Sequence, residues 1–190
     1  ETLKAIAQAM PDLHVRAGYG LLPRLTATRQ PIYRDRLPVE EAQRRINAIH
    51  TPYHAALIDL LLKAQTRFGR ALLVDFHSMP AHDRRNTRLP DIVLGDGGGT
   101  TISRDTGAAI AKHLSATGLT VGWNHPYAGG HITRNYGDAR STQQSLQIEI
   151  NRDLYMDGSA RLDIDKSIKL AEVIGGLGKF IVKILMSPTH

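Results

Sequence analysis

The stretch "LLVDFHSMPAHD", Leu72–Asp83, places an acid and an imidazole directly after an apolar run. The run Ala71–Phe76 has the length and composition of a parallel strand that is covered on both faces. A long helix is predicted before it, at about Val39–Phe68, because apolar residues recur there at helical spacing until Gly69. We therefore expect a helix followed by a buried strand that carries Asp75 and His77 to one place.

Helices and strands alternate along the rest of the chain. The apolar or alternating segments "LPDIVLGD", "LTVGWN" and "SLQIEIN" predict strands, whereas "DTGAAIAKHLSATG" and Asp163–Met186 predict helices. This order indicates the α/β class, with a mixed, mostly parallel central sheet flanked by helices. We expect residues 1–190 to form a single catalytic domain. In such sheets, ligands bind at the carboxyl ends of the strands.

Composition narrows the function classes. The chain has 190 residues, 42% hydrophobic and 22% charged, which suits a globular domain with a core. A net charge of +6 fits either an ordinary basic surface or a small anionic substrate; with only 5% aromatic residues it does not favour nucleic-acid binding. There is no cysteine, so a transition metal would need histidine and carboxylate ligands. No apolar run approaches the ~20 residues of a membrane span, so no membrane association is predicted.

Asp75 and His77 are the first candidate pair. They are two residues apart, so in an extended segment both side chains project to the same side. We place His77 just past the carboxyl end of its strand, where the carboxylate of Asp75 can orient the imidazole or share its ligand. The alternative is a structural histidine that is hydrogen-bonded at the end of a strand.

The segment "SLQIEINRDLY" supplies a second candidate. Gln147, Glu149 and Asn151 share one side of the predicted strand, and Ile148 and Ile150 share the other. A carboxylate near a histidine at the end of a sheet can act as general base on a metal-bound water. The alternative is that this polar side faces solvent at an edge of the sheet.

The segment "WNHPYAGGHITRNYG" supplies a third candidate, a loop after a predicted strand. Gly129 and Gly130 permit close backbone approach or positive φ, and the planar fork of Arg134 could bind a carboxylate. Further polar side chains surround the glycine pair: Asn124, His125, Tyr127 and His131. We interpret the two histidines as supporting or structural residues, because a separation of six positions in a loop is not a recognised ligand spacing.

Two other patterns are weaker. His50 and His54 lie four apart on the long helix and could share a metal, but no H-E-x-x-H motif is present, which favours an exposed helix surface. The segment "GDGGGTT" is similar to a phosphate loop but lacks the Lys-Ser/Thr ending of that motif.

Seven segments together resemble the N-formylglutamate amidohydrolase family. In order, from about Gly18 to Asp157, they are "RAGYGLLPR", "IYRDRLP", "PYHAAL", "LLVDFHSMP", "PDIVLGD", "NHPYAGGHITRNYG" and "LQIEINRDLYMD". The resemblance implies a fold like that of zinc carboxypeptidases. It also implies a cytoplasmic zinc-dependent hydrolase that releases formate from N-formyl-L-glutamate in histidine breakdown.

The resemblance also implies residue roles. His77 would bind one zinc ion per chain, other divalent metals being alternatives, and Glu149 would be the general base and then the acid. Arg134 would bind a substrate carboxylate, and Arg34 is a weaker candidate for the second carboxylate. Further residues would line the substrate pocket: Asn124, Tyr127, Gly129 and Gly130. Others would support the metal ligand and the base: Asp75, Ser78 and Asn151.

The family's other zinc ligands have no match in this sequence. They lie in a P-H-S-G-like stretch and an acidic stretch, and nothing before Ala17 resembles either. The chain opens without an initiator Met in an apparent helix, Thr2–Ala9. We therefore expect an amino-terminal segment of the same domain, with the remaining ligands, upstream of this sequence.

The leading prediction is a metal-dependent amidohydrolase acting on a small anionic N-acyl amino acid, N-formyl-L-glutamate. One alternative keeps the chemistry but changes the substrate to another N-acyl amino acid or an N-acylated peptide. A second alternative is a non-catalytic binding module of the same fold that lacks the metal. The sequence does not predict an oligomeric state.

Overall fold

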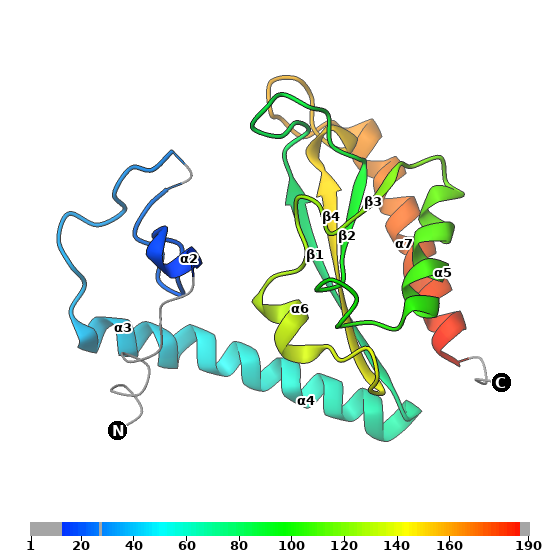
Figure 1. Ribbon diagram of the computed structural model, residues 1–190, viewed down its shortest axis with the longest axis horizontal. Coiled ribbons are helices and arrows are strands. Elements are labelled where there is room, and N and C mark those ends of the chain that lie inside the picture. The colour runs from blue at the N-terminus through cyan, green and yellow to red at the C-terminus, as the bar shows by residue number, and fades with distance from the viewer. Residues whose placement is uncertain (1–12, 27, 187–190) are drawn as a thin grey trace. The chain divides into compact units, whose positions relative to one another are not determined.

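The computed structural model, shown in Figure 1, describes residues 13–26 and 28–186. The helix predicted at Thr2–Ala9 lies outside these residues. The chain divides into two compact units, Glu1–Leu57 and Ile58–His190, which are described separately below.

The first unit is helical and loop-rich. It contains the short helix α2 (Leu13–Arg16), the helix α3 (Val39–Arg45), the π-helical segment η1 (Ile46–His50) and the start of α4 (Thr51–Phe68). The helix predicted at Val39–Phe68 is therefore confirmed and consists of α3, η1 and α4. Glu41 in the first turn of α3 accepts hydrogen bonds from Arg44 and Arg45 at 2.7 Å, and these bonds lower its pKa to about 2.

The second unit is built on a four-stranded sheet. Its strands are β1 (Ala71–Met79), β2 (Ile92–Gly95), β3 (Val121–Trp123) and β4 (Gln143–Asn151), in the order β1-β4-β2-β3. β1 is parallel to β4 and β2 is parallel to β3, whereas β2 and β4 are antiparallel. The sheet is mixed and mostly parallel, which confirms the predicted fold class.

β1 is longer than the sequence predicted. It runs to Met79, so His77 lies inside the strand and not just past its end, and that placement was wrong. The reason is the partner strand: β4 pairs with β1 in register along its full length, with His77 opposite Glu149 and Met79 opposite Asn151. β4 lies between β1 and β2 and is buried at most positions, so the alternative of an exposed edge does not hold for Glu149.

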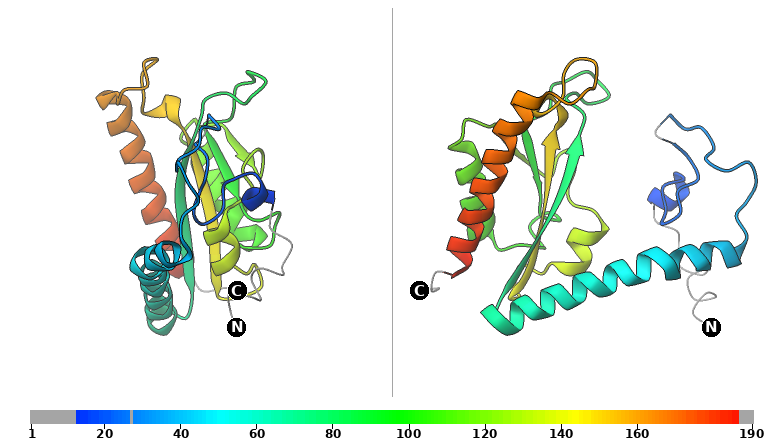
Figure 2. Two further views of the ribbon diagram at one scale, coloured as in Figure 1. Left: turned by 90° about the vertical axis from the view of Figure 1, so that its left-hand side faces the viewer. Right: turned by 180° about the vertical axis from the view of Figure 1, so that it is seen from behind.

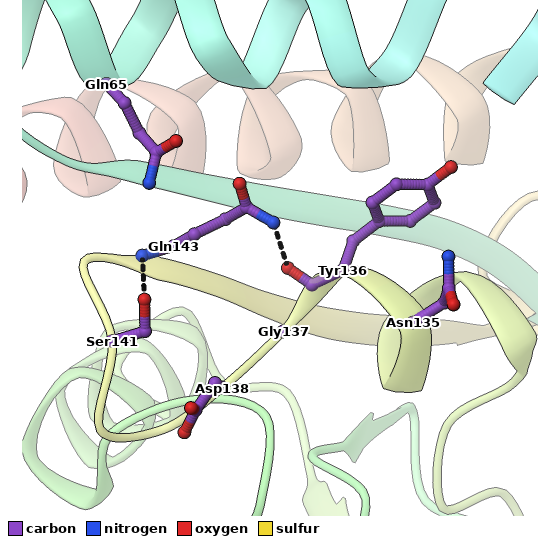
Figure 3. Close-up of a pocket in the computed structure, with 7 residues that line it drawn as sticks. All are labelled: Gln65, Asn135, Tyr136, Gly137, Asp138, Ser141 and Gln143. Carbon is purple, nitrogen blue, oxygen red and sulfur yellow. Dashed lines mark hydrogen bonds between the residues drawn. The ribbon is translucent and has the colours of Figure 1, made fainter. Parts of the chain in front are cut away.

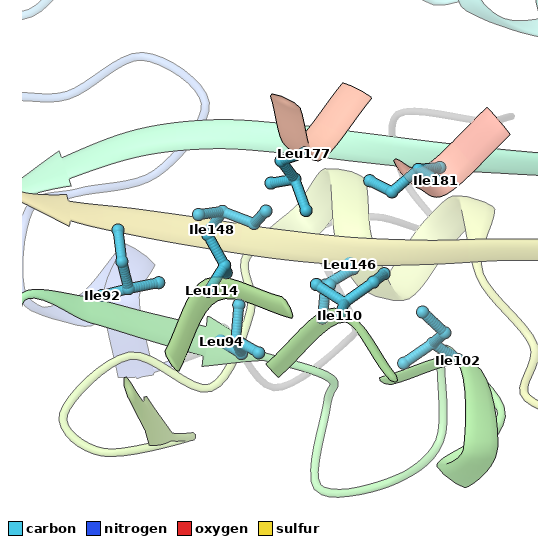
Figure 4. Packing of buried hydrophobic residues seen from close by; sticks show 9 residues of the cluster. All are labelled: Ile92, Leu94, Ile102, Ile110, Leu114, Leu146, Ile148, Leu177 and Ile181. Carbon is cyan, nitrogen blue, oxygen red and sulfur yellow. The ribbon is translucent and has the colours of Figure 1, made fainter. Parts of the chain in front are cut away.

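One face of the sheet forms the hydrophobic core with two helices. α5 (Arg104–Ser115) and α7 (Ile164–Met186) pack on this face and against each other, as Figure 2 shows. The strands contribute Ile92, Leu94, Leu146 and Ile148 to this core. Figure 4 shows the whole cluster: Ile92, Leu94, Ile102, Ile110, Leu114, Leu146, Ile148, Leu177 and Ile181. No helix among the described residues is both long and apolar enough to cross a membrane.

The opposite face of the sheet carries polar side chains. The short helix α6 (His131–Tyr136) packs on β1 and β4 there, on the side of the sheet away from α5 and α7 (Figure 1). At the end of β4, the 3-10 helix η2 (Arg152–Leu154) begins the connection to α7. The apolar face therefore anchors the sheet, and the polar face is available for chemistry.

Candidate functional site

Strand alternation and register bring the candidate side chains together. Asp75 and His77 on β1 lie opposite Gln147 and Glu149 on β4, and paired residues of a parallel ladder point to the same face. The intervening residues of β4, such as Ile148, point into the core. The apolar side chains of β4 thus hold the strand against the core, and the four polar side chains of β1 and β4 lie together on the opposite face.

His77 and Asp75 form a contact pair. The imidazole Nε2 of His77 lies 3.1 Å from Oδ1 of Asp75. The side chain of His77 is 50% exposed, whereas that of Asp75 is 17% exposed. A mostly buried carboxylate therefore fixes the orientation of a half-exposed imidazole, which is how proteins commonly hold a metal-binding or catalytic histidine. His77 also borders a cavity of about 550 Å³ beside Phe76 and Ile150.

Glu149 is the buried acid of the site, with 5% of its surface exposed. Burial raises the pKa of its carboxyl, and the nearby charge of Asp75 adds to the rise. His77, a hydrogen bond from Gln147 and the charge of Arg152 act in the opposite direction. A raised pKa makes the carboxylate a stronger proton acceptor, as a general base requires.

Gln147 connects Glu149 to the first turn of α6. The backbone N–H of Gly130 donates to Oε1 of Gln147 at 2.7 Å, and Nε2 of Gln147 donates to Oε1 of Glu149 at 2.7 Å. Sequence reasoning placed Gln147 on the side of Glu149 but gave it no role. The available signal was its position two residues before Glu149 on an alternating strand.

The loop between β3 and α6 covers part of this face. Tyr127 packs against a small cluster formed by Met79, Leu89 and Val93. Gly129 has φ +104°, which favours glycine. Gly95 on β2 permits the close approach of this loop, since a Cβ there would lie 2.6 Å from the backbone nitrogen of Gly129. The role of Gly95 was not predicted.

Asn124, predicted to line the pocket, holds the glycine-rich loop after β2. Its Oδ1 accepts from the backbone N–H groups of Asp96 and Gly98, and its Nδ2 donates to Oδ1 of Asp96 at 2.8 Å. The segment "GDGGGTT" is therefore folded around the side chains of Asp96 and Asn124. A direct contact of Asn124 with substrate stays a prediction.

Asn151 and Ser78 support the end of the sheet. The Nδ2 of Asn151 donates to the backbone oxygens of Leu89 and Pro90, which joins β4 to the loop between β1 and β2. Ser78 belongs to the face opposite His77 by strand alternation, and its Oγ accepts from Nε of Arg152 at 3.4 Å. The supporting roles of Asn151 and Ser78 toward the metal ligand and the base stay predictions.

The two predicted arginines have exposed side chains. Arg134 is exposed on α6, and a Cβ at Gly97 would lie 3.9 Å from its Cγ. Arg34 is exposed in the first unit. His50 and His54, also in the first unit, have ring centroids 4.1 Å apart, as their spacing on a helix predicts. The carboxylate-binding roles of the two arginines stay predictions.

A second cavity lies at the other end of α6. It has a volume of about 260 Å³, and Figure 3 shows the residues that line it: Gln65, Asn135, Tyr136, Gly137, Asp138, Ser141 and Gln143. Its polar groups largely bond one another: Nε2 of Gln143 donates to the backbone oxygen of Tyr136, and the N–H of Gln143 donates to Oγ of Ser141. Residues of α4, α6 and β4 and of the connection between α6 and β4 line this cavity.

Comparison with known proteins points to one family. Residues 4–156 match the model of the family described as N-formylglutamate amidohydrolase. N-formylglutamate deformylases of Pseudomonas aeruginosa and Pseudomonas putida are 33% and 32% identical to the chain over 153 and 154 residues. These matches cover 78% and 76% of the chain but only 58% and 56% of those relatives. The chain therefore spans little more than half the length of the curated relatives it matches.

Solved structures agree with the family match. The crystal structure of an N-formylglutamate amidohydrolase from Ralstonia eutropha JMP134 has a TM-score of 0.78 and 34% identity, over 93% of this chain and 64% of that one. A gene product of Agrobacterium tumefaciens has a TM-score of 0.64 at 18% identity, over 86% of this chain and 62% of that one, which shows the shared fold alone.

Proposed function

Since the chain belongs to the N-formylglutamate amidohydrolase family, we propose that it hydrolyses N-formyl-L-glutamate to formate and L-glutamate with the help of a bound metal. The observation that carries the proposal is the cross-strand pair of His77 and Glu149, with Asp75 beside the imidazole. The substrate is proposed from family membership, and the pair offers an imidazole that can bind a metal and a carboxylate that can act as general base.

His77 is the zinc ligand proposed at this face. Imidazole nitrogen and carboxylate oxygen are zinc ligands, and a catalytic zinc usually has three protein ligands and an open position. Contact of Nε2 of His77 with Asp75 leaves Nδ1 to bind the metal, with Asp75 as the group that orients the ring. The remaining ligands are proposed to come from outside this sequence, because the relatives extend well beyond the matched part. Bound zinc would polarise the formyl carbonyl and acidify the attacking water.

Glu149 is proposed to move the proton. Its carboxylate takes a proton from the attacking water, whose oxygen forms the new bond to the formyl carbon. As the carbon–nitrogen bond breaks, Glu149 returns the proton to the leaving amine, which gives formate and glutamate. The raised pKa of Glu149 favours the first of these transfers, and the bond from Gln147 keeps the carboxylate in place between the two steps.

The substrate is a dianion, and the proposal assigns its carboxylates to arginines. Arg134 on α6 is proposed to bind one carboxylate through two parallel N–H···O bonds, with Arg34 as the candidate for the other. Tyr127, Gly129 and Gly130 border the same face and are proposed to line the pocket. Cytoplasmic location and a role in histidine breakdown are proposed with the substrate.

The test is the activity of Glu149→Gln in the protein at its natural length. This change keeps size and hydrogen bonding but removes the base, so kcat for formate release should fall ~10²–10⁴-fold with zinc content unchanged. Assays with N-acetyl and N-formyl derivatives of several amino acids would identify another acyl substrate. Near-normal kcat in Glu149→Gln would refute the assignment of the base, and bound zinc without hydrolysis of any substrate would favour a binding module.

A further inference from the structure

Gln147 is a buried polar residue that is not proposed to contact the substrate. It is 4% exposed and lies in the central strand β4, between Asp75 on β1 and Gly95 on β2. Its neighbours fix how its amide is turned. The backbone N–H of Gly130 can only donate, so it must meet Oε1 of Gln147, and this leaves Nε2 to donate to Glu149.

We propose that Gln147 is a positioning residue, which holds the Glu149 carboxylate in its reactive orientation and couples it to the first turn of α6. The proposal rests on the proposed function, in which Glu149 is the base. One carboxylate oxygen, Oε1, is held by Gln147 at 2.7 Å, and Oε2 is proposed to be the oxygen that takes the proton from the attacking water. The same amide also binds Gly130, so the proposed substrate loop and the base are fixed to one side chain.

The competing explanation is purely structural. Gln147 could serve only as the acceptor that satisfies the N–H of Gly130, a residue at the amino end of α6. Changing Gln147 to glutamate separates the two roles. A glutamate still offers an oxygen to Gly130, but it has no N–H for Glu149 and places a second negative charge against it.

Gln143 on the same strand provides a matched control. Its Nε2 also donates to a group at α6, the backbone oxygen of Tyr136, and it lies opposite Ala71, away from Glu149. Gln143→Glu is the same chemical change, on the same strand, at the same helix. It tests the general cost of a glutamate at this face without touching the proposed base.

The experiment compares formate release by the wild type, Gln147→Glu and Gln143→Glu at natural length, with thermal unfolding as the check of folding. We expect Gln147→Glu to lower kcat about 10–100-fold, the range for groups that orient a catalytic residue, with KM changed less than about twofold. Gln143→Glu should keep kcat. Equal kcat in all three proteins would overturn the role of Gln147 and leave the proposed function intact. If Gln147→Glu does not fold, the exchange measurement below, which needs no substitution at Gln147, decides between the two roles.

A second measurement does not depend on the substrate. In protein with ¹⁵N-labelled glutamine, the side-chain N–H protons of Gln147 should exchange with water at least about tenfold more slowly in the wild type than in Glu149→Ala, because the carboxylate acceptor is gone. Equally fast exchange in both proteins would overturn the proposal. If no protein releases formate, the proposed function fails, and the exchange rates alone decide whether Gln147 holds Glu149.

Discussion

Replacing Gly95 by alanine should displace the loop that covers the site. The backbone of Gly95 has no positive φ, so the change tests space alone. Its new Cβ would lie 2.6 Å from the nitrogen of Gly129 and 2.9 Å from the carbonyl carbon of Ala128. Both are backbone atoms that cannot rotate away, so the loop or β2 must shift. Ordinary contact begins near 3.4 Å, and the displacement needed is therefore about 0.8 Å.

Overpacking of this kind costs about 1–3 kcal/mol of unfolding free energy. In a chain of this size, each 1 kcal/mol lowers Tm by roughly 2–4 °C, so we expect a fall of roughly 2–12 °C in thermal unfolding followed by circular dichroism. The shift also moves Gly130, which hydrogen-bonds Gln147. Misplacement of about 1 Å can cost 10²-fold in rate, so kcat for formate release should fall by about one to two orders of magnitude.

Gly178→Ala is the matched control. Gly178 lies in α7, is exposed, and a Cβ there would meet no atom within 4 Å. Alanine in an exposed helix is preferred to glycine by up to about 1 kcal/mol, so this variant should be slightly more stable and fully active. Unchanged Tm and kcat in Gly95→Ala would show that the loop does not lie on β2 as described here, and the reasoning about the cover of the site would be refuted.

Three further predictions concern charged residues. Arg134→Ala should raise KM for N-formyl-L-glutamate about tenfold or more, since a hydrogen bond to a charged group contributes about 1.5–3 kcal/mol. The control Arg140→Ala changes a side chain that is 94% exposed and should leave KM unchanged, and equal KM values in the two variants would exclude Arg134 as the carboxylate-binding residue. His77→Ala should remove zinc measured by elemental analysis after dialysis, and full zinc content would place the metal elsewhere. In metal-free protein, burial raises the pKa of Glu149 above its ordinary value of 4.5, so the folded state holds this proton to higher pH than the unfolded state and stability falls as pH rises through that window. Glu149→Gln removes this loss, so its stability relative to the wild type should rise as the pH increases above about 4.5 in urea unfolding, and a constant difference would contradict the raised pKa.

The strands and helices were readable from the sequence because their patterns are local. The apolar run at Ala71–Phe76 and the alternation around Glu149 each follow from a single segment. The end of β1 was not readable, because it depends on the pairing partner: Ser78 and Met79 extend the strand only through their ladder with Ile150 and Asn151. Edge or central placement of β4 was undecidable for the same reason.

The site divides in a similar way. His77, Asp75 and Glu149 could be proposed from the sequence, because acidic and imidazole side chains recur at every second position of the predicted strands. Gln147 and Gly95 were missed, because their roles come from contacts with the backbone of residues 128–130, which sequence spacing does not reveal. Asn124 was predicted to line the pocket, but its side chain hydrogen-bonds Asp96 and holds the glycine-rich loop after β2.

Metal-assisted hydrolysis is tested by formate release from N-formyl-L-glutamate, measured with the protein at its natural length before and after treatment with a chelator. We predict turnover that disappears with the chelator and returns when zinc is added. Turnover that is unaffected by complete removal of metal would contradict the metal-assisted mechanism, and no turnover by zinc-loaded protein would contradict the proposed substrate.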